Sequence, residues 1–339
     1  MKVGNNILKN IELEKEFIRL HDMIRPWDQR NEEEDYFINF WLDTVNKQYH
    51  EIEKRYFSVV RSREEIYSEL RQIFDKKIVI PFADFGVNTV CSLACKNCIQ
   101  LQPYFKKHEV FEATKLIGWL EQIFKFCDYI HIISPLGGEP FINKDLSKFI
   151  DYLYQKKQEG KIGFIRLVTN GTICPESSII ESLAREGIFV LVGNYENVLT
   201  DYHKKQRHEL IEKFEKIGVK YTLAEPDFEW FDMGKCEERR NLTEEQIQRS
   251  FATCNFKNCA GIFEGKLYRC GKLYSLEQTV QMESNEVECI DFTKISRREE
   301  LKNKLYQFYC AKKITGCLYC NLPEERVRIP VAEQLNREV

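Results

Sequence analysis

Three cysteines stand within eight residues of one another, as Cys91, Cys95 and Cys98 in a C-x3-C-x2-C motif. A loop of this length can bring three thiolates to one iron–sulfur cluster, and such clusters normally take four thiolates. With only three, one iron keeps an open position, which is typical of a reactive metal rather than a structural one. The spacing alone leaves two alternatives open, a zinc knuckle or three incidental core cysteines.

Two polar turns follow this motif, each directly after an apolar run. Gly137, Gly138 and Glu139 follow one run, and Asn170 follows the next. Two glycines allow a ligand to approach the backbone closely, and a glutamate accepts hydrogen bonds from an ammonium group. Either turn alone would be read as a simple turn. Because the ends of parallel strands meet at one rim, we expect both turns and the cysteine loop to lie together there.

In this order, the cysteine loop and the two turns resemble the radical S-adenosylmethionine (SAM) superfamily, over residues 78–225. The resemblance implies that the three cysteines hold a [4Fe–4S] cluster whose open iron chelates the amino and carboxylate groups of SAM. It also implies reductive cleavage of SAM to a 5′-deoxyadenosyl radical, which abstracts hydrogen from a C–H bond. The family usually has an aromatic residue before the third cysteine, where this chain has Asn97. The residues that the resemblance assigns to SAM are Gly137, Gly138, Glu139, Asn170 and Asn194.

A second set of cysteines lies beyond residue 226. Ten residues, a glycine and four residues separate Cys254 from Cys270, and the pair Cys317-x2-Cys320 follows. This pattern resembles the SPASM domain, or its shorter twitch form, which carries auxiliary clusters in the superfamily. The resemblance implies that these four thiolates ligate one auxiliary [4Fe–4S] cluster.

Alternatives remain for this second set. Cys259 or Cys310 could replace one of the four proposed ligands, and a zinc ribbon could be built from the same thiols. The glycine of the pattern, Gly265, is flanked by the apolar pairs 262–263 and 267–268, which predicts the turn of a small hairpin.

Apolar runs alternate with helical stripes between residues 78 and 224. The first expected strand begins with residues 78–80, and the others cover residues 129–134, 164–169, 189–192 and 221–224. The expected helices contain residues 116–123, 146–153, 179–183 and 210–217. This alternation predicts an α/β fold with a parallel sheet and crossover helices. The resemblance refines it to a partial (β/α)6 TIM-like barrel.

The chain divides into three expected parts. Residues 1–76 carry apolar positions at helical spacing and predict a helical N-terminal extension. Residues 77–226 form the partial barrel, and residues 227–339, where the alternation stops and cysteine becomes dense, form the auxiliary iron–sulfur domain.

Composition excludes several classes of protein. The chain has 339 residues with a net charge of −3, so bulk charge gives no sign of nucleic-acid binding. No apolar run approaches the roughly 20 residues of a membrane span, and the N-terminus lacks a secretory pattern. We therefore expect a cytoplasmic protein. Its 13 cysteines, an odd number, argue against a disulfide framework.

The residues that each candidate reaction requires limit the reactions that this chain could catalyse. Family members with auxiliary clusters oxidise alcohols, epimerise carbon centres or modify peptides. Oxidation needs a base, for which Asp232 is the candidate, and epimerisation needs a hydrogen-donating thiol, for which Cys259 is the first candidate and Cys236 the second. The purely helical first segment favours a small polar substrate, such as a sugar, aminocyclitol or glycan intermediate.

Two other functions stay open. The chain could be a maturase of a ribosomally made peptide, with the helical segment binding a leader. It could also be a zinc-binding module with no catalysis. The radical enzyme would need a one-electron reductant such as flavodoxin or ferredoxin as its partner.

Overall fold

The computed structural model describes residues 77–335, without 225–229, 235, 255 and 258. From Ile78 onward the chain forms one compact unit. The predicted helical extension, residues 1–76, lies outside the described residues, and so does the side chain of Cys310.

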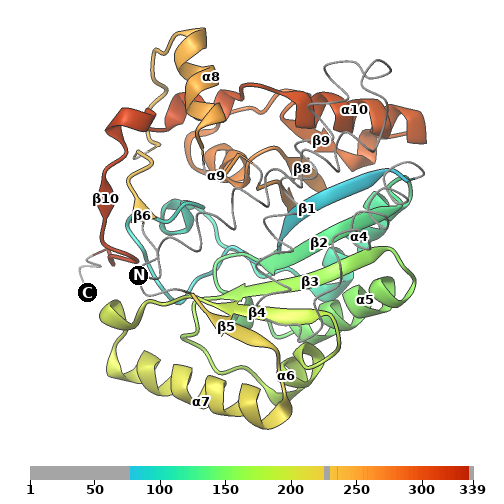
Figure 1. Cartoon of the computed structure of the whole chain (residues 1–339), viewed down its shortest axis with the longest axis vertical. Helices are drawn as coiled ribbons and strands as arrows, with labels where there is room; N and C mark the ends of the chain where they lie inside the picture. The colour runs from blue at the N-terminus through green and yellow to red at the C-terminus, as the bar shows by residue number, and fades with distance from the viewer. Residues whose placement is uncertain (1–76, 225–229, 235, 255, 258, 336–339) are drawn as a thin grey trace, which may run out of the picture. The chain divides into compact units, whose positions relative to one another are not determined.

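Five parallel strands form the centre of the fold, each at a position where the sequence predicts one (Figure 1). They are β1 (Val79–Gly86), β2 (Tyr129–Leu136), β3 (Ile162–Thr169), β4 (Ile188–Val192) and β5 (Tyr221–Leu223). Their order in the sheet is β5-β4-β3-β2-β1, so each strand lies beside its neighbour in sequence. The predicted α/β fold with a mainly parallel sheet is confirmed.

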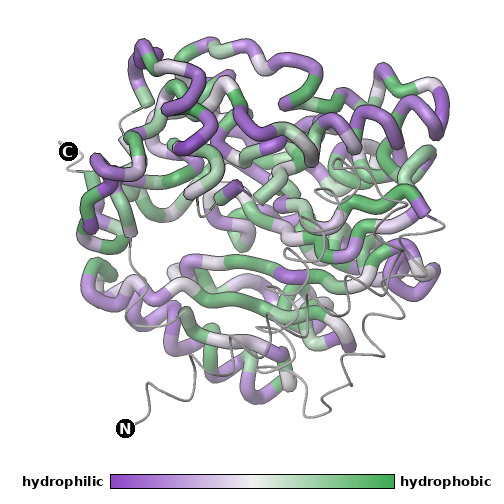
Figure 2. The backbone as a smooth tube through the Cα atoms, turned by 45° about the horizontal axis from the view of Figure 1, so that its top comes forward, coloured by the Kyte–Doolittle hydropathy of each residue, from purple (hydrophilic) through white to green (hydrophobic). Residues whose placement is uncertain are grey.

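Four helices connect these strands and cover the outer face of the sheet (Figure 1). They are α4 (Ala113–Phe124), α5 (Leu146–Gln158), α6 (Ser177–Leu183) and α7 (Asp201–Ile217). The predicted stripe on α4 is Leu116, Trp119, Leu120 and Ile123. Its three aliphatic side chains are fully buried and Trp119 is half-buried. Each fully buried side chain contributes about 1.5–3 kcal/mol to folding. Hydrophobic residues run along the strands and alternate with polar ones along the helices (Figure 2).

The sheet continues past β1 into the second set of cysteines. β7 (Gly261–Phe263) pairs parallel with β1 and antiparallel with β8 (Lys266–Tyr268), which pairs with β9 (Cys289–Asp291). The predicted hairpin is confirmed: Glu264 and Gly265 form its turn with φ of 50° and 75°, as a two-residue type I′ turn requires. One sheet therefore crosses the predicted boundary at residue 226, and the three-part division remains a prediction.

The remaining elements surround this hairpin. The helices are α8 (Glu244–Ala252), α9 (Gly271–Val280) and α10 (Arg298–Cys310), and the short strands β6 (Trp230–Phe231) and β10 (Arg328–Ile329) pair antiparallel. A 3-10 turn, η6 (Thr315–Tyr319), carries Cys317. None of the described helices has the length and apolar character needed to cross a bilayer.

Candidate metal centres

The cysteine loop is fastened to the glycine turn by a buried asparagine. Asn88, two residues past β1, is fully buried. Its Oδ1 accepts hydrogen bonds from the backbone N–H groups of Val90 and Gly138, both at 3.1 Å, and its Nδ2 donates to the Glu139 carbonyl at 2.8 Å. The Glu139 N–H in turn donates to the Val90 carbonyl at 2.8 Å. These hydrogen bonds fix the position of the segment after β1 relative to the turn after β2.

This close packing of the two segments explains why glycine is required at positions 137 and 138. A Cβ at Gly137 would overlap the carbonyl oxygen of Asn88, and a Cβ at Gly138 would overlap the carbonyl of Val90. From the sequence, these two glycines were expected to leave space for a ligand. In the structure the group that approaches is the backbone of the cysteine loop itself.

Glu139 joins the glycine turn to the end of β3. Its carboxylate accepts hydrogen bonds from the Thr169 hydroxyl at 2.7 Å, the Phe141 N–H at 3.1 Å and the Asn170 N–H at 2.7 Å. The side chain is fully buried, and burial raises its pKa to about 7 against the effect of these donors. One lone-pair direction on Oε2 has no protein donor among these contacts. The predicted contact with an ammonium group remains a prediction.

Asn170, directly after β3, contacts the cysteine loop at the same edge of the sheet. Its Nδ2 donates to the Ser92 hydroxyl at 3.0 Å and lies 3.7 Å from Sγ of Cys91. Its Oδ1 accepts from the N–H and hydroxyl of Thr172, at 2.9 and 2.7 Å. Asn194, the fifth residue assigned to SAM, is partly buried two residues past the end of β4. The cysteine loop, the glycine turn and Asn170 are thus brought together as predicted.

The three sulfurs of the loop lie close enough to affect one another's charge. Burial, joined by the nearby sulfurs, raises the pKa of Cys91 to about 12 and that of Cys95 to about 11, and burial also raises the pKa of Cys98. Backbone N–H groups of residues 100–102 donate toward Sγ of Cys98. Iron binding must therefore displace protons from these thiols, as metal binding to cysteine generally does. Three convergent thiols with N–H donors fit the three-thiolate side of an iron–sulfur cluster.

Two residues at this centre were missed by the sequence argument. Gln334, near the C-terminus, donates from Nε2 to Sγ of Cys95 at 3.3 Å and accepts from the Ala94 N–H at 2.8 Å. Tyr195 lies near all three cysteines, and burial, reinforced by their sulfurs, raises its pKa. It places an aromatic ring beside the loop, which has asparagine at position 97. Neither residue belongs to a local motif, so only the fold could reveal them.

The predicted auxiliary ligands also converge. Cys254, Cys270, Cys317 and Cys320 come from separate segments, yet each lies within electrostatic range of others of the set. Burial raises the pKa of Cys270 to about 12, helped by the sulfurs of Cys254 and Cys320. Four convergent thiols fit a fully ligated cluster. That these four are the ligands remains a prediction.

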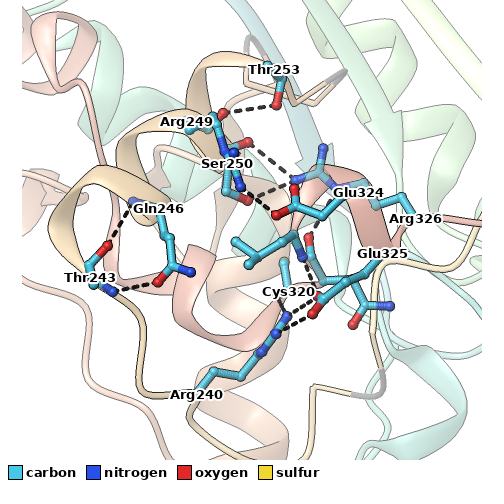
Figure 3. Close-up of polar contacts among 12 residues, drawn as sticks. Arg240, Thr243, Gln246, Arg249, Ser250, Thr253, Cys320, Glu324, Glu325 and Arg326 are labelled. Carbon is cyan, nitrogen blue, oxygen red and sulfur yellow. Dashed lines mark hydrogen bonds and ion pairs between the residues drawn. The ribbon is translucent and has the colours of Figure 1, made fainter.

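The segment that carries Cys320 is held by an extensive polar network (Figure 3). Arg240 donates to the Cys320 carbonyl at 2.9 Å and forms a bidentate ion pair with Glu325, at 2.6 and 2.7 Å. Arg326 donates to the Ser250 hydroxyl on α8 at 2.8 Å. Bidentate pairs fix geometry as well as contributing energy, so the C-x2-C segment is tightly positioned.

Cys259 lies within electrostatic range of Cys254 and Cys270 of this set, and also of a charged pair on the inner face of the sheet. Burial raises its pKa to about 12, and Asp84 and Arg166 are the next largest influences. Arg166 Nη2 lies 3.5 Å from Asp84 Oδ1, and Arg166 Nε donates to the Ser134 hydroxyl at 3.3 Å. Phe85 packs on Phe149 of α5, so Asp84, its neighbour in β1, points to the opposite, inner face. This pair was not predicted from the sequence.

The two acidic groups differ in environment. Burial raises the pKa of Asp84 to about 6, although Arg166 and Ser134 oppose that effect. Asp232, the base suggested by the sequence, follows β6 and closes a turn by accepting from the Gly234 N–H at 2.8 Å. Its catalytic role remains a prediction.

In the part of the chain that the structure describes, no three or more His, Cys, Asp or Glu side chains are grouped to hold a metal ion. A four-iron cluster is bound differently, by thiolates that each take a separate iron.

No family model matches the chain, and no curated protein does so either. Among solved structures, anSMEcpe with bound AdoMet and Cp18Cys peptide is 16% identical over 42% of this chain and 42% of its own, with a TM-score of 0.33. SuiB from Streptococcus suis, bound to S-adenosylmethionine, is 17% identical over 57% of this chain and 49% of its own, with a TM-score of 0.35. The chain spans half or less of the length of these two.

A third structure matches over more of its length. BtrN in complex with AdoMet and 2-DOIA is 15% identical over 76% of this chain and 97% of its own, with a TM-score of 0.39. At such identities and TM-scores the likeness does not bear on activity, which has to be argued from this chain's own residues. These three solved structures are of radical SAM enzymes.

Proposed function

We propose that this chain is a radical SAM enzyme that oxidises an alcohol of a small polar substrate, such as a sugar, aminocyclitol or glycan intermediate. The observation that carries the proposal is the interlocking of the cysteine loop with the Gly137–Glu139 turn and Asn170, at the ends of three neighbouring strands. A [4Fe–4S] cluster at Cys91, Cys95 and Cys98 would supply the electron that cleaves SAM to the 5′-deoxyadenosyl radical. A one-electron carrier such as flavodoxin or ferredoxin would be its partner.

The inner face of the sheet offers groups suited to an alcohol. Asp84 has a pKa of about 6, so it is ionised at neutral pH and well matched to take a hydroxyl proton. Arg166 and Ser134 orient its carboxylate. Burying a charged pair such as Asp84–Arg166 costs desolvation free energy that largely offsets the attraction between the charges, so the pair adds little to stability. This supports a functional role for the pair.

The test is reductive SAM cleavage. Protein reconstituted anaerobically with iron and sulfide is incubated with dithionite and SAM, and 5′-deoxyadenosine and methionine are measured. We expect equal amounts of the two products and a brown protein with about eight irons per chain. A colourless, zinc-containing protein that leaves SAM intact would support the non-catalytic module instead. Deuterated sugars, aminocyclitols and candidate precursor peptides then identify which class transfers deuterium to 5′-deoxyadenosine.

The pH dependence of oxidation tests Asp84 directly. Because the base must be ionised, we expect kcat to rise about tenfold per pH unit below pH 6 and to level off above pH 7. Asp84→Asn should lower kcat by about 10²–10⁴-fold and abolish this acid limb. Asp232→Asn is the matched comparison. If Asp84→Asn keeps the normal pH profile of kcat and Asp232→Asn loses activity and the acid limb, Asp232 is the base.

Epimerisation is the second candidate, because a specific thiol favours it. Burial raises the pKa of Cys259 to about 12, so this thiol is protonated at neutral pH and has a hydrogen atom to donate. If the enzyme is an epimerase, Cys259→Ala should give no inverted product and should accumulate substrate radical, measured by electron paramagnetic resonance. If the enzyme oxidises alcohols, the same variant should still turn over. Iron content before assay shows whether Cys259 is instead a cluster ligand.

A further inference from the structure

A buried lysine lies among the sulfurs of the auxiliary set. Lys272, in the first turn of α9, is only 5% exposed. Its Nζ lies 3.6 Å from Sγ of Cys320. It also hydrogen-bonds Cys236 and interacts electrostatically with Cys270. Within the described residues no ion pair joins Lys272 to a carboxylate.

The same ammonium also lies within electrostatic range of Cys98 in the first centre. Cys98 belongs to the SAM-binding loop and Cys320 to the auxiliary set, so one positive charge stands within range of both.

Burying an ammonium is costly unless a negative charge compensates it. Neutral thiols cannot do so, whereas thiolates bound to iron carry the charge that is needed. The N-terminus of α9, where Cys270 is the N-cap residue, adds a further partial positive charge. The site is therefore built for sulfurs that hold negative charge.

We propose that Lys272 raises the reduction potential of the auxiliary cluster, so that this cluster accepts the electron released by the substrate radical. A fixed positive charge in a low-dielectric site favours the more negative, reduced form of a neighbouring centre. The inference rests on the proposed alcohol oxidation. There the carbinol C–H hydrogen atom goes to the 5′-deoxyadenosyl radical, the hydroxyl proton to Asp84 and the remaining electron to the auxiliary cluster. A one-electron carrier of the flavodoxin or ferredoxin class then removes that electron.

The experiment isolates the auxiliary cluster. In full-length protein with Cys91, Cys95 and Cys98 all changed to Ala, the reconstituted sample is titrated with reductant and followed by electron paramagnetic resonance. Lys272→Met removes the charge at similar volume, and Lys272→Gln is a second neutral variant. Lys272→Arg keeps the charge. Lys302→Met removes an exposed lysine on α10 and controls for net charge.

We expect both neutral variants to lower the equilibrium constant for reduction at least tenfold, which is 59 mV for one electron. The Arg variant and Lys302→Met should keep the original potential. Neutral variants that retain about four irons and an unchanged potential would overturn the role of Lys272. Loss of iron in both neutral variants would overturn it too, since Lys272 would then serve assembly. If the triple Cys→Ala protein that retains Lys272 fails to bind four irons, the auxiliary cluster assumed in the proposed function does not exist.

Discussion

Cys98→Ala should abolish SAM cleavage while leaving the auxiliary cluster in place. The three loop thiols are the only ligands proposed for the first cluster, and the loss of one leaves two, too few to hold it. Cys98 receives N–H donors from residues 100–102, so the local backbone is shaped around its sulfur. We expect iron to fall from about eight to about four atoms per chain and 5′-deoxyadenosine to fall to the uncatalysed background.

The measurement combines iron and sulfide analysis with the SAM cleavage assay. Cys174→Ala is the matched control, because Cys174 is a half-buried free cysteine between β3 and α6 and belongs to neither set. It should keep full iron content and full activity. If Cys98→Ala cleaves SAM normally, the first cluster is not where we place it. If both variants lose iron equally, the loss reflects general instability.

Much of this centre could be predicted because its signals are local. Strand and helix periods placed β1–β5 and α4–α7, and the polar residues at strand ends then had to meet at one rim. The hairpin around Gly265 followed from two apolar pairs that flank a residue able to take a positive φ. Cysteine spacing supplied the rest.

What the sequence did not reveal depends on pairing between distant segments. Gln334 contacts Cys95 across 239 positions of sequence, and β7 pairs with β1 across 177, from Asp84 to Gly261. Neither contact produces a periodic pattern in the sequence. Lys272 lies in the first turn of a helix, and its role depends on sulfurs from other segments of the chain. Asp84 and Arg166 did leave a signal, a charge inside an apolar strand, which favours a functional group over a structural one.

Gly138→Ala should separate the cysteine loop from the turn that faces it. The added Cβ would overlap the carbonyl group of Val90 and crowd the backbone nitrogen of Cys91. Both are backbone atoms, and the Val90 carbonyl already accepts the Glu139 N–H, so they cannot move aside as a flexible side chain would. Gly138 does not have a left-handed φ, and the penalty is therefore steric, about 1–3 kcal/mol of unfolding free energy.

The effect on function should be larger than the effect on stability. A shift of the loop moves the Cys91 sulfur relative to Glu139 and Asn170, and errors of about 1 Å can cost about 10²-fold in rate. We expect loss of the spectral change on SAM addition, with iron largely retained.

Gly118→Ala is the control for this substitution, because a Cβ there meets nothing within 4 Å on an exposed part of α4. It should stabilise the helix by about 1 kcal/mol and leave SAM binding unchanged. Thermal unfolding and titration with SAM, monitored by electron paramagnetic resonance, measure both quantities on each variant. Normal SAM binding by Gly138→Ala would mean that the contact between turn and loop does not form the SAM site. The three strand ends would then have to be assigned to another ligand.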